Sequence, residues 1–325
     1  MGMISVHRME AEDLEGVLPV IEGCKFKPYF YLQRFDDSTL SRFLLSKVKE
    51  AAARDDSEIL LAVVDGRAVG FAVLRKLSWD SDFFGFGCAA LEHLVAAGDY
   101  AESLDTKSIL LGGVDEICRR WKIRNISARA ALADLSTVHS MEKCGFTTAG
   151  VLSALFWENG QPIRRLKTLY GVRPFRQGDI EMLEATARGS MRWDRFHADS
   201  RFPKEKSDLL YAQLTRNLCL GKICDAVLVA DRDDKPVGFV ACKILHDDNA
   251  HLPLRLGFFR FMAVSQKAGI GAGVALHETA LGWFCERADI VLGITQVQNI
   301  PNLKINLRYG HRYGASFLDL QKWFW

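Results

Sequence analysis

The stretch Gln266-Lys267-Ala268-Gly269-Ile270-Gly271-Ala272 is the strongest indication of the fold of this chain. It follows an apolar run typical of a strand, residues 258–264, and it precedes a run typical of a helix, residues 274–287. Glycines at such a junction let the backbone approach an anion, and the free N–H groups of the first helical turn can bind it. The order of strand, glycine loop and helix therefore predicts a pyrophosphate-binding loop, with a plain structural turn as the alternative.

Other nucleotide-binding loops fit this stretch poorly. The chain has no Gly-x-x-x-x-Gly-Lys-Ser/Thr run, which excludes a P-loop. Gly269, Gly271 and Gly273 are one residue short of the Gly-x-Gly-x-x-Gly spacing of dinucleotide-binding folds.

Composition sets the class of protein. The chain has 325 residues, enough for two domains, and its 49% hydrophobic and 25% charged residues are typical of a soluble globular protein. A net charge of +2 argues against a large nucleic-acid surface but allows a local basic patch for an anionic substrate. We find no signal peptide and no apolar run near the roughly 20 residues that span a bilayer, so we expect a cytoplasmic protein with no membrane partner.

The eight cysteines are scattered and form no Cys-x-x-Cys pair. Cys219 and Cys224 lie five residues apart with no histidine pair nearby, so no metal site is predicted. Free thiols in apolar surroundings are the expected state.

The chain reads as two copies of one mixed α/β pattern. Each copy predicts an opening strand, two helical regions, two strands joined by a polar turn, a fourth strand with a following helix, a fifth strand, a short helix and a last strand. Residues 158–166 read as a linker, which predicts domains at 1–160 and 165–325.

One spacing supports this duplication. Asp134 precedes Gly145 by eleven residues, and Asn299 precedes Gly310 by eleven. In each copy the polar residue would follow the fifth strand, and the glycine would end the next short helix in the left-handed conformation.

The two copies differ where the glycine loop would lie. Residues 96–104 of the first copy lack the paired glycines and contain Asp99 and Glu102, which would repel a pyrophosphate. We therefore expect a degenerate first copy that has lost cofactor binding and contributes packing and part of the substrate cleft.

The loop pattern Gln/Arg-x-x-Gly-x-Gly/Ala resembles the acyl-CoA loop of the GNAT (GCN5-related) N-acetyltransferases. Residues 79–86 and 195–202 resemble segments of a tandem-domain group similar to TDP-fucosamine (TDP-4-amino-4,6-dideoxygalactose) acetyltransferase. The resemblance spans most of the chain. It implies an α/β class with a mixed sheet and a tandem GNAT-like acyl-CoA N-acyltransferase fold, with the N-terminal copy degenerate.

This resemblance implies that acetyl-CoA donates an acetyl group to a primary amine, that of a nucleotide-linked amino sugar. The loop amides would hold the pyrophosphate, the end of the preceding strand would polarise the thioester carbonyl, and polar residues after the fifth strand would contact the pantetheine arm. A simple helix N-cap is the alternative role of Asn299. The implied cofactor-binding residues are Met262, Ala263, Val264, Gln266, Lys267, Ala268, Gly269, Ile270, Gly271, Ala272, Asn299 and Asn302.

The implied catalytic positions are Tyr309, His197 and Asn306. Many GNAT enzymes carry a tyrosine seven residues after the Asn, where it protonates the leaving thiolate, but here that position is Asn306, whose amide cannot act as an acid. Tyr309, three residues on, is the candidate acid, with packing or cofactor contact as the alternative. His197 is the candidate base; an acidic neighbour, a water-mediated path or a purely structural loop are the alternatives.

Other functions stay open at this point. The chain could be a GNAT enzyme for an antibiotic, a polyamine or a protein terminus, or a sensor that binds CoA without turnover. Arg192, Arg195 and Arg201 favour an anionic substrate. Residues 79–86 would stack a nucleobase or fill the core, and the aromatic end 322–325 would finish a strand or form a homodimer contact.

Overall fold

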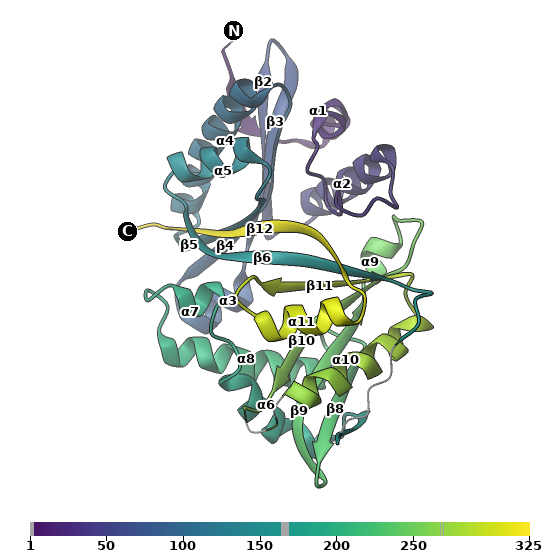
Figure 1. The fold of residues 1–325 in the computed structure, drawn as a ribbon. Helices are drawn as coiled ribbons and strands as arrows, with labels where there is room; N and C mark the ends of the chain where they lie inside the picture. The colour runs from purple at the N-terminus through teal and green to yellow at the C-terminus, as the bar shows by residue number, and fades with distance from the viewer. Residues whose placement is uncertain (1–2, 164–168, 267, 269) are drawn as a thin grey trace. The chain divides into compact units, whose positions relative to one another are not determined.

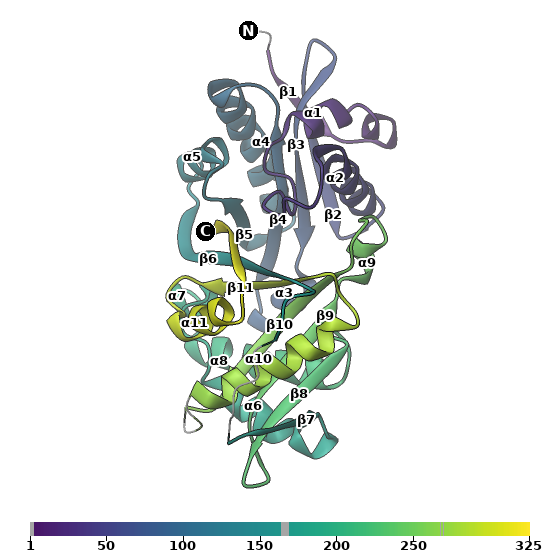
Figure 2. The same cartoon turned by 45° about the vertical axis from the view of Figure 1, so that its right-hand side comes forward.

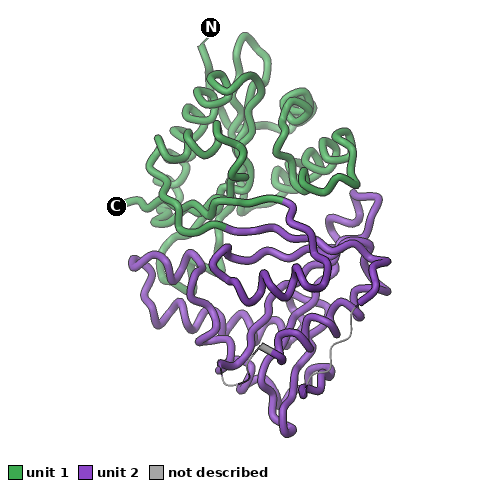
Figure 3. The backbone as a smooth tube through the Cα atoms, in the orientation of Figure 1, with its two compact units in different colours: residues 1–151, 315–325 green, residues 152–314 purple. Residues whose placement is uncertain are grey.

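A computed structural model of the chain describes residues 3–163, 169–266, 268 and 270–325. The chain divides into two compact units, residues 1–151 with 315–325 and residues 152–314 (Figure 3). Each unit combines a mixed sheet with helices, which confirms the predicted α/β class. The predicted domains, 1–160 and 165–325, stay a prediction.

The sheet of the first unit has the strand order β1, β2, β3, β4, β5 and β12. Neighbouring strands are antiparallel except β4 and β5, which are parallel. The predicted last strand of the second copy, β12, thus pairs with β5 of the first copy. The bounds are β1 Ser5–Arg8, β2 Ser57–Val64, β3 Arg67–Lys76, β4 Gly87–Ala96, β5 Ile123–Ala131 and β12 Arg312–Trp323.

Alternating side chains give this sheet two apolar faces. In β2, Leu60 and Ala62 pack with one hydrophobic cluster, and Ile59 and Leu61 pack with another. Helices α4 and α5 cover the first face, and α1 and α2 cover the other (Figures 1 and 2). The helices are α1 Leu18–Gly23, α2 Asp37–Ala52, α3 Ser78–Phe84, α4 Tyr100–Arg120 and α5 Leu135–Lys143, with a short 3-10 helix at Ala11–Leu14.

The sequence predicts helices near residues 11–22 and 107–122, and both have other bounds in the structure. The helix predicted near residues 11–22 is split, because Pro19 lacks an N–H group and suits the first turn of a new helix. Helix α4, predicted from residue 107, begins at Tyr100, because Asp99 and Glu102 form a capping box. The Asp99 carboxylate accepts from the Glu102 amide, and the Glu102 carboxylate accepts from the Asp99 amide, both at 3.0 Å.

The sheet of the second unit has the strand order β6, β11, β10, β9, β8 and β7. Neighbouring strands are antiparallel except β10 and β11, which are parallel. The predicted last strand of the first copy, β6, pairs with β11 of the second copy. The bounds are β6 Thr147–Glu158, β7 Gly171–Pro174, β8 Ala226–Arg232, β9 Lys235–Ile244, β10 Leu256–Val264 and β11 Ile290–Gln296.

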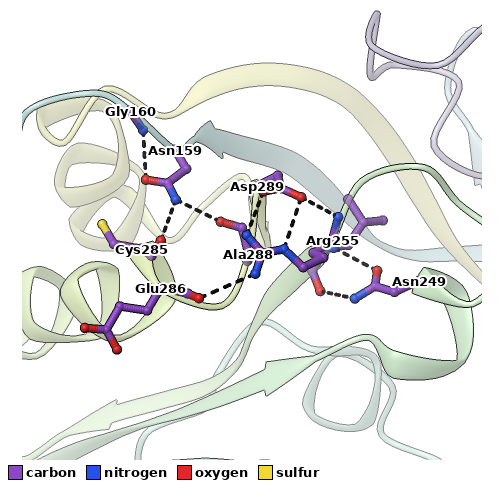
Figure 4. Close-up of polar contacts among 9 residues, drawn as sticks. Asn159, Gly160, Asn249, Arg255, Cys285, Glu286, Ala288 and Asp289 are labelled. Atoms are coloured by element: carbon purple, nitrogen blue, oxygen red, sulfur yellow. Dashed lines mark hydrogen bonds and ion pairs between the residues drawn. The ribbon is translucent and has the colours of Figure 1, made fainter.

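Helix α10 packs on the strands of this sheet through buried apolar side chains that include Leu276, Leu281 and Phe284. Its C-terminal end is fixed by Asn159, whose side-chain amide donates to the carbonyls of Cys285 at 2.6 Å and Ala288 at 3.1 Å (Figure 4). The helices are α6 Ile180–Arg188, α7 Arg195–Ala198, α8 Lys204–Cys219, α9 His246–Asn249, α10 Ile270–Cys285 and α11 Ile300–Arg308, with a 3-10 helix at Gln177–Asp179.

The repeated eleven-residue spacing corresponds to the same local structure in both units. Asp134 and Asn299 are the N-caps of α5 and α11, and their side chains accept from the backbone N–H three residues later. Gly145 and Gly310 follow these helices with φ of 86° and 81°, the left-handed conformation that the sequence predicts.

A pair of buried histidines lies in the core of the second unit. His277 of α10 stacks on Phe259 at 4.7 Å between ring centroids, and His311 lies 5.0 Å from His277. Among the described residues, Nε2 of His277 and both ring nitrogens of His311 have no hydrogen-bond partner. Burial lowers the pKa of His277 well below its ordinary value and lowers that of His311 to about 4, so both rings are neutral near pH 7.

We expect the second unit to lose stability as the pH falls from about 6.5 to 4. Within that window histidines bind protons in the unfolded chain but stay neutral in the folded one, so the free energy of unfolding decreases as the pH falls. His311 alone would lower the free energy of unfolding by on the order of 3 kcal/mol. Hydrogen exchange of peptides from α10 and β10 would measure this loss. His311→Phe keeps the ring packing without titrating, so its loss over the window should be smaller. An equal loss in wild type and His311→Phe would contradict the expectation.

Candidate functional site

The strand, loop and helix order predicted over residues 258–287 is present in the second unit. Strand β10 ends at Val264, Gln266 is exposed in the following turn, and α10 begins at Ile270. Lys267 and Gly269, two of the predicted cofactor-binding residues, lie outside the described residues. The binding role of the loop stays a prediction.

Strand β10 contains a β-bulge, and its parallel pairing with β11 ends well before the strand does. Its register with β9 shifts between Phe259 and Phe261, which places a bulge at Arg260. The sequence predicts thioester-polarising donors at Ala263 and Val264, but these residues and Met262 lie beyond the bulge, in regular pairing with β9. Pairing with β11 covers only 256–258, so the facing edge of β10 is free of that partner at 262–264.

Tyr170 packs against the start of α10. Its hydroxyl donates to the carbonyl of Ala268, and its ring atom Cε2 lies 3.0 Å from where a Cβ on Gly271 would be. A larger residue at position 271 would therefore meet this ring as well as any bound anion. The sequence does not single out Tyr170, because the local pattern around residue 170 does not show that this side chain contacts the loop at Ala268.

The predicted polar residues after β11 cluster on α11. Asn299 caps the helix through the Asn302 amide at 3.3 Å, which is the alternative role that the sequence leaves open. The side-chain amide of Asn306 donates to the carbonyl and the side chain of Asn302, at 2.8 and 2.6 Å. Asn306 is buried, so its position in the helix is fixed by its own neighbours.

Tyr309, the candidate acid, is buried at the end of α11. Its hydroxyl donates to Glu278 at 3.0 Å, and its ring lies 5.2 Å from His277. Glu278 lies seven residues beyond Gly271, about two turns along α10. This arrangement favours the packing role that the sequence leaves open for Tyr309, and its role as an acid stays a prediction.

His197 lies between two carboxylates. Its Nδ1 is 2.6 Å from Asp194 and its Nε2 is 3.0 Å from Asp208, while its ring stacks on Tyr211. Asp194 is buried and also caps the short helix α7 by accepting from the Phe196 amide at 2.9 Å. An ionised carboxylate can only accept, so in this arrangement each ring nitrogen donates to its carboxylate, and Nε2 can accept a proton only after it leaves Asp208.

One hollow of about 760 Å³ brings the predicted acceptor segment and the glycine loop together. His197 and Asp208 line it with Gln266, and so do two cations, Arg192 and Lys204. Neither cation has an ion-pair partner among the residues that the structure describes. Of the other predicted arginines, Arg201 pairs with Asp199 at 2.7 Å and Arg195 lies over the Phe196 ring.

Asp208 is the residue of this hollow that the sequence analysis missed. It lies on α8, eleven residues after His197, and its side chain is 32% exposed. Carboxylates are common in the first turns of helices, so the sequence does not mark Asp208 as special. Its contact with His197 depends on the turn between α7 and α8. The signal was the run of charges around residues 204–208, which is equally typical of a solvated helix face.

The described residues include no group of three or more His, Cys, Asp or Glu side chains placed to hold a metal ion. All eight cysteines are free thiols, and burial raises the pKa of several of them, Cys224 to about 11 and Cys219 to about 12. None of the described helices combines the length and apolar character that a membrane crossing requires.

Comparison with known proteins places the fold. No protein-family model matches the chain, and no curated protein matches it. Among solved structures, a GCN5-related N-acetyltransferase from Sphaerobacter thermophilus is 13% identical, with 98% of this chain and 95% of that chain covered and a TM-score of 0.64.

Two further structures are similar along their whole length. A tandem GNAT protein from the clavulanic acid biosynthesis pathway is 11% identical, with 99% and 98% of the two chains covered and a TM-score of 0.57. A GNAT-family acetyltransferase from Colwellia psychrerythraea is 11% identical, with 99% and 100% covered and a TM-score of 0.52. At these identities the similarity shows the fold, and the chain has the mixed α/β fold of tandem GNAT acyltransferases.

Proposed function

We propose that the protein is an acyl-CoA-dependent N-acyltransferase whose second unit binds the donor and the amine. The observation that carries this proposal is the shared hollow, in which Gln266 of the glycine loop and the His197–Asp208 pair line one space of about 760 Å³. A transferase needs its donor and acceptor sites to meet within bonding distance. The fold supports the same reaction class by analogy.

The donor would lie with its pyrophosphate at the start of α10. The first amides of this helix are unpaired within the helix and would bind the anion, with Gln266, Ala268, Gly271 and Ala272 around it. Acetyl-CoA supplies the thioester, the activated acyl group of the reaction. The open edge of β10 beyond Phe258 would receive the acyl end.

The acceptor amine would bind at Asp208 and lose its proton to His197. Asp208 would attract the ammonium group and release Nε2 of His197, while Asp194 keeps its bond to Nδ1–H, so that Nε2 becomes free to accept the proton. The neutral nitrogen then bonds to the carbonyl carbon, the C–S bond breaks, the nitrogen releases its second proton to water, and the thiolate takes up a proton. Tyr309 stays the candidate donor of that proton, for which it would have to leave Glu278.

A nucleotide-linked amino sugar is the acceptor that the hollow supports best. Its amine matches Asp208, and its diphosphate matches Arg192 and Lys204, both of which line the same space. A polyamine would meet these two cations with like charge, which disfavours it. The coarser proposal of amine acylation does not depend on this choice of acceptor.

Gly271→Glu is expected to weaken acetyl-CoA binding by at least about 100-fold, because the new carboxylate would lie among the first amides of α10 and repel the pyrophosphate. Calorimetric titration with acetyl-CoA measures this, with folding checked by circular dichroism. Gly282→Glu adds the same charge to the same helix at an exposed position with open space around its Cβ, and should bind normally. Gly271→Ala tests the contact with Tyr170 alone. Normal affinity in a folded Gly271→Glu variant would rule out the loop assignment.

His197→Gln is expected to lower kcat by about 10² to 10⁴-fold, with acetyl-CoA affinity unchanged, because the variant cannot accept the amine proton. The measurement is release of free CoA thiol with TDP-4-amino-4,6-dideoxygalactose, spermidine and a peptide with a free N-terminus as acceptors, across pH. His251→Gln, an exposed histidine of the same unit outside the hollow, is the matched control. A variant as fast as this control would remove His197 from the mechanism.

A further inference from the structure

The first unit contains its own cavity, at the place where β4 and β5 separate. Their parallel pairing ends at Leu91 and Ala128, and residues 92–95 and 129–131 beyond that point line a space of about 230 Å³. A cavity of about 150 Å³ already holds benzene, and drug-sized ligands need about 300 Å³ or more. The size therefore fits a small molecule of roughly one ring.

Most of this cavity is apolar. Phe26, Phe30 and Phe317 contact one another edge to face at 5.4 and 6.3 Å between centroids, and Leu94 and Met141 close other sides. The segment that carries Phe26 and Phe30 is anchored by the buried Lys27, whose ammonium donates to the carbonyls of Glu22 and Cys24. A ligand would therefore need an apolar body.

Three charged side chains that line the cavity are compensated by opposite charges. These ion pairs are Lys27–Asp37 at 2.7 Å, Asp134–Lys107 at 3.3 Å and Glu92–Arg54 at 2.5 Å. The fourth is Arg129, whose ion pair with the buried Asp319 is the longest of the four, at 3.5 Å. In the described part of the chain Arg129 has no other ion-pair partner, and it is 45% exposed, at the mouth of the cavity. The least tightly compensated charge that lines this cavity is thus positive.

His93 adds a neutral hydrogen-bonding group inside the cavity. Burial lowers its pKa to about 4, so its ring is uncharged near pH 7 and presents one N–H donor and one acceptor nitrogen. Within the described residues it makes no hydrogen bond or ion pair of its own.

A nucleotide is excluded by the start of α4. In this unit the amides of Asp99 and Glu102 at the start of the helix donate to the carboxylates of their own capping box, and a Cβ on Gly98 would collide with the Glu102 carboxylate. Two carboxylates at this position repel a pyrophosphate. The ligand is therefore small and carries no diphosphate.

We propose that this cavity is a binding site for a small monocarboxylate, with the apolar body between β4 and β5 and the carboxylate paired with Arg129. A bidentate guanidinium–carboxylate pair uses the planar fork of Arg129, and the apolar walls exclude water from it. The site is independent of the proposed acyl transfer, because all of its residues belong to the first unit.

Titration with 4-fluorobenzoate, followed by fluorine NMR line width on the full chain, tests this site. We expect saturable binding below about 10 mM that Arg129→Gln weakens by at least about tenfold. Arg124→Gln changes another exposed arginine of β5 that lies outside the cavity and should bind as the wild type does. Uncharged 4-fluorobenzamide should bind at least about tenfold more weakly than the acid.

Three results of this titration would each overturn the proposal, and two further experiments add to them. These are no saturation by about 10 mM, equal affinity for the acid and the amide, or equal weakening in Arg124→Gln and Arg129→Gln. Arg192→Gln in the second unit distinguishes the two anion sites, since loss of binding there instead of in Arg129→Gln would place the ligand in the hollow at His197. Competition by acetyl-CoA for the 4-fluorobenzoate site would also overturn the chemical class.

Discussion

The early end of one parallel strand pairing is the constraint on which the rest of each unit depends. In the first unit β4 follows β5 only as far as Leu91, and in the second β10 follows β11 only as far as Phe258. Beyond these points both strands stay in the sheet through their antiparallel partners, so the opening does not unravel the fold. A register shift in β4 and another in β10, close to where each pair parts, turn the strand away from its neighbour.

The packing around this opening explains why it persists. Apolar side chains alternate to both faces of the sheet, and α4 or α10 covers one face with a long row of buried residues. Each fully buried aliphatic or aromatic side chain contributes about 1.5–3 kcal/mol, so the covered faces outweigh the few backbone pairings that are lost where the strands part. Backbone groups left unpaired at the opening cost free energy, and a polar ligand that hydrogen-bonds to them would reduce this cost.

The sequence predicts the elements well and their partners poorly. Strand β10 has its predicted end at Val264, and the glycines at 145 and 310 adopt the predicted left-handed conformation, because these features depend on alternation and on backbone sterics within a few residues. Local pattern does not encode which edge a last strand joins, so the pairing of β12 with β5 was not foreseen. For the same reason the sequence did not predict the contact of His197 with Asp208, which depends on the turn between α7 and α8.

The two units show how one scaffold can present opposite charge at the same place. The helix that follows the bulged strand begins at Tyr100 in the first unit and at Ile270 in the second. In the first unit the Asp99 and Glu102 carboxylates accept from amides at the start of the helix and place negative charge there. The start of α10 instead carries Gly271 and Ala272, with no carboxylate among the described residues of its first turn. Negative charge at a helix N-terminus repels a phosphate that the helix would otherwise attract. Two acidic residues therefore suffice to make the first unit unfavourable for a phosphate ligand while the sheet stays the same.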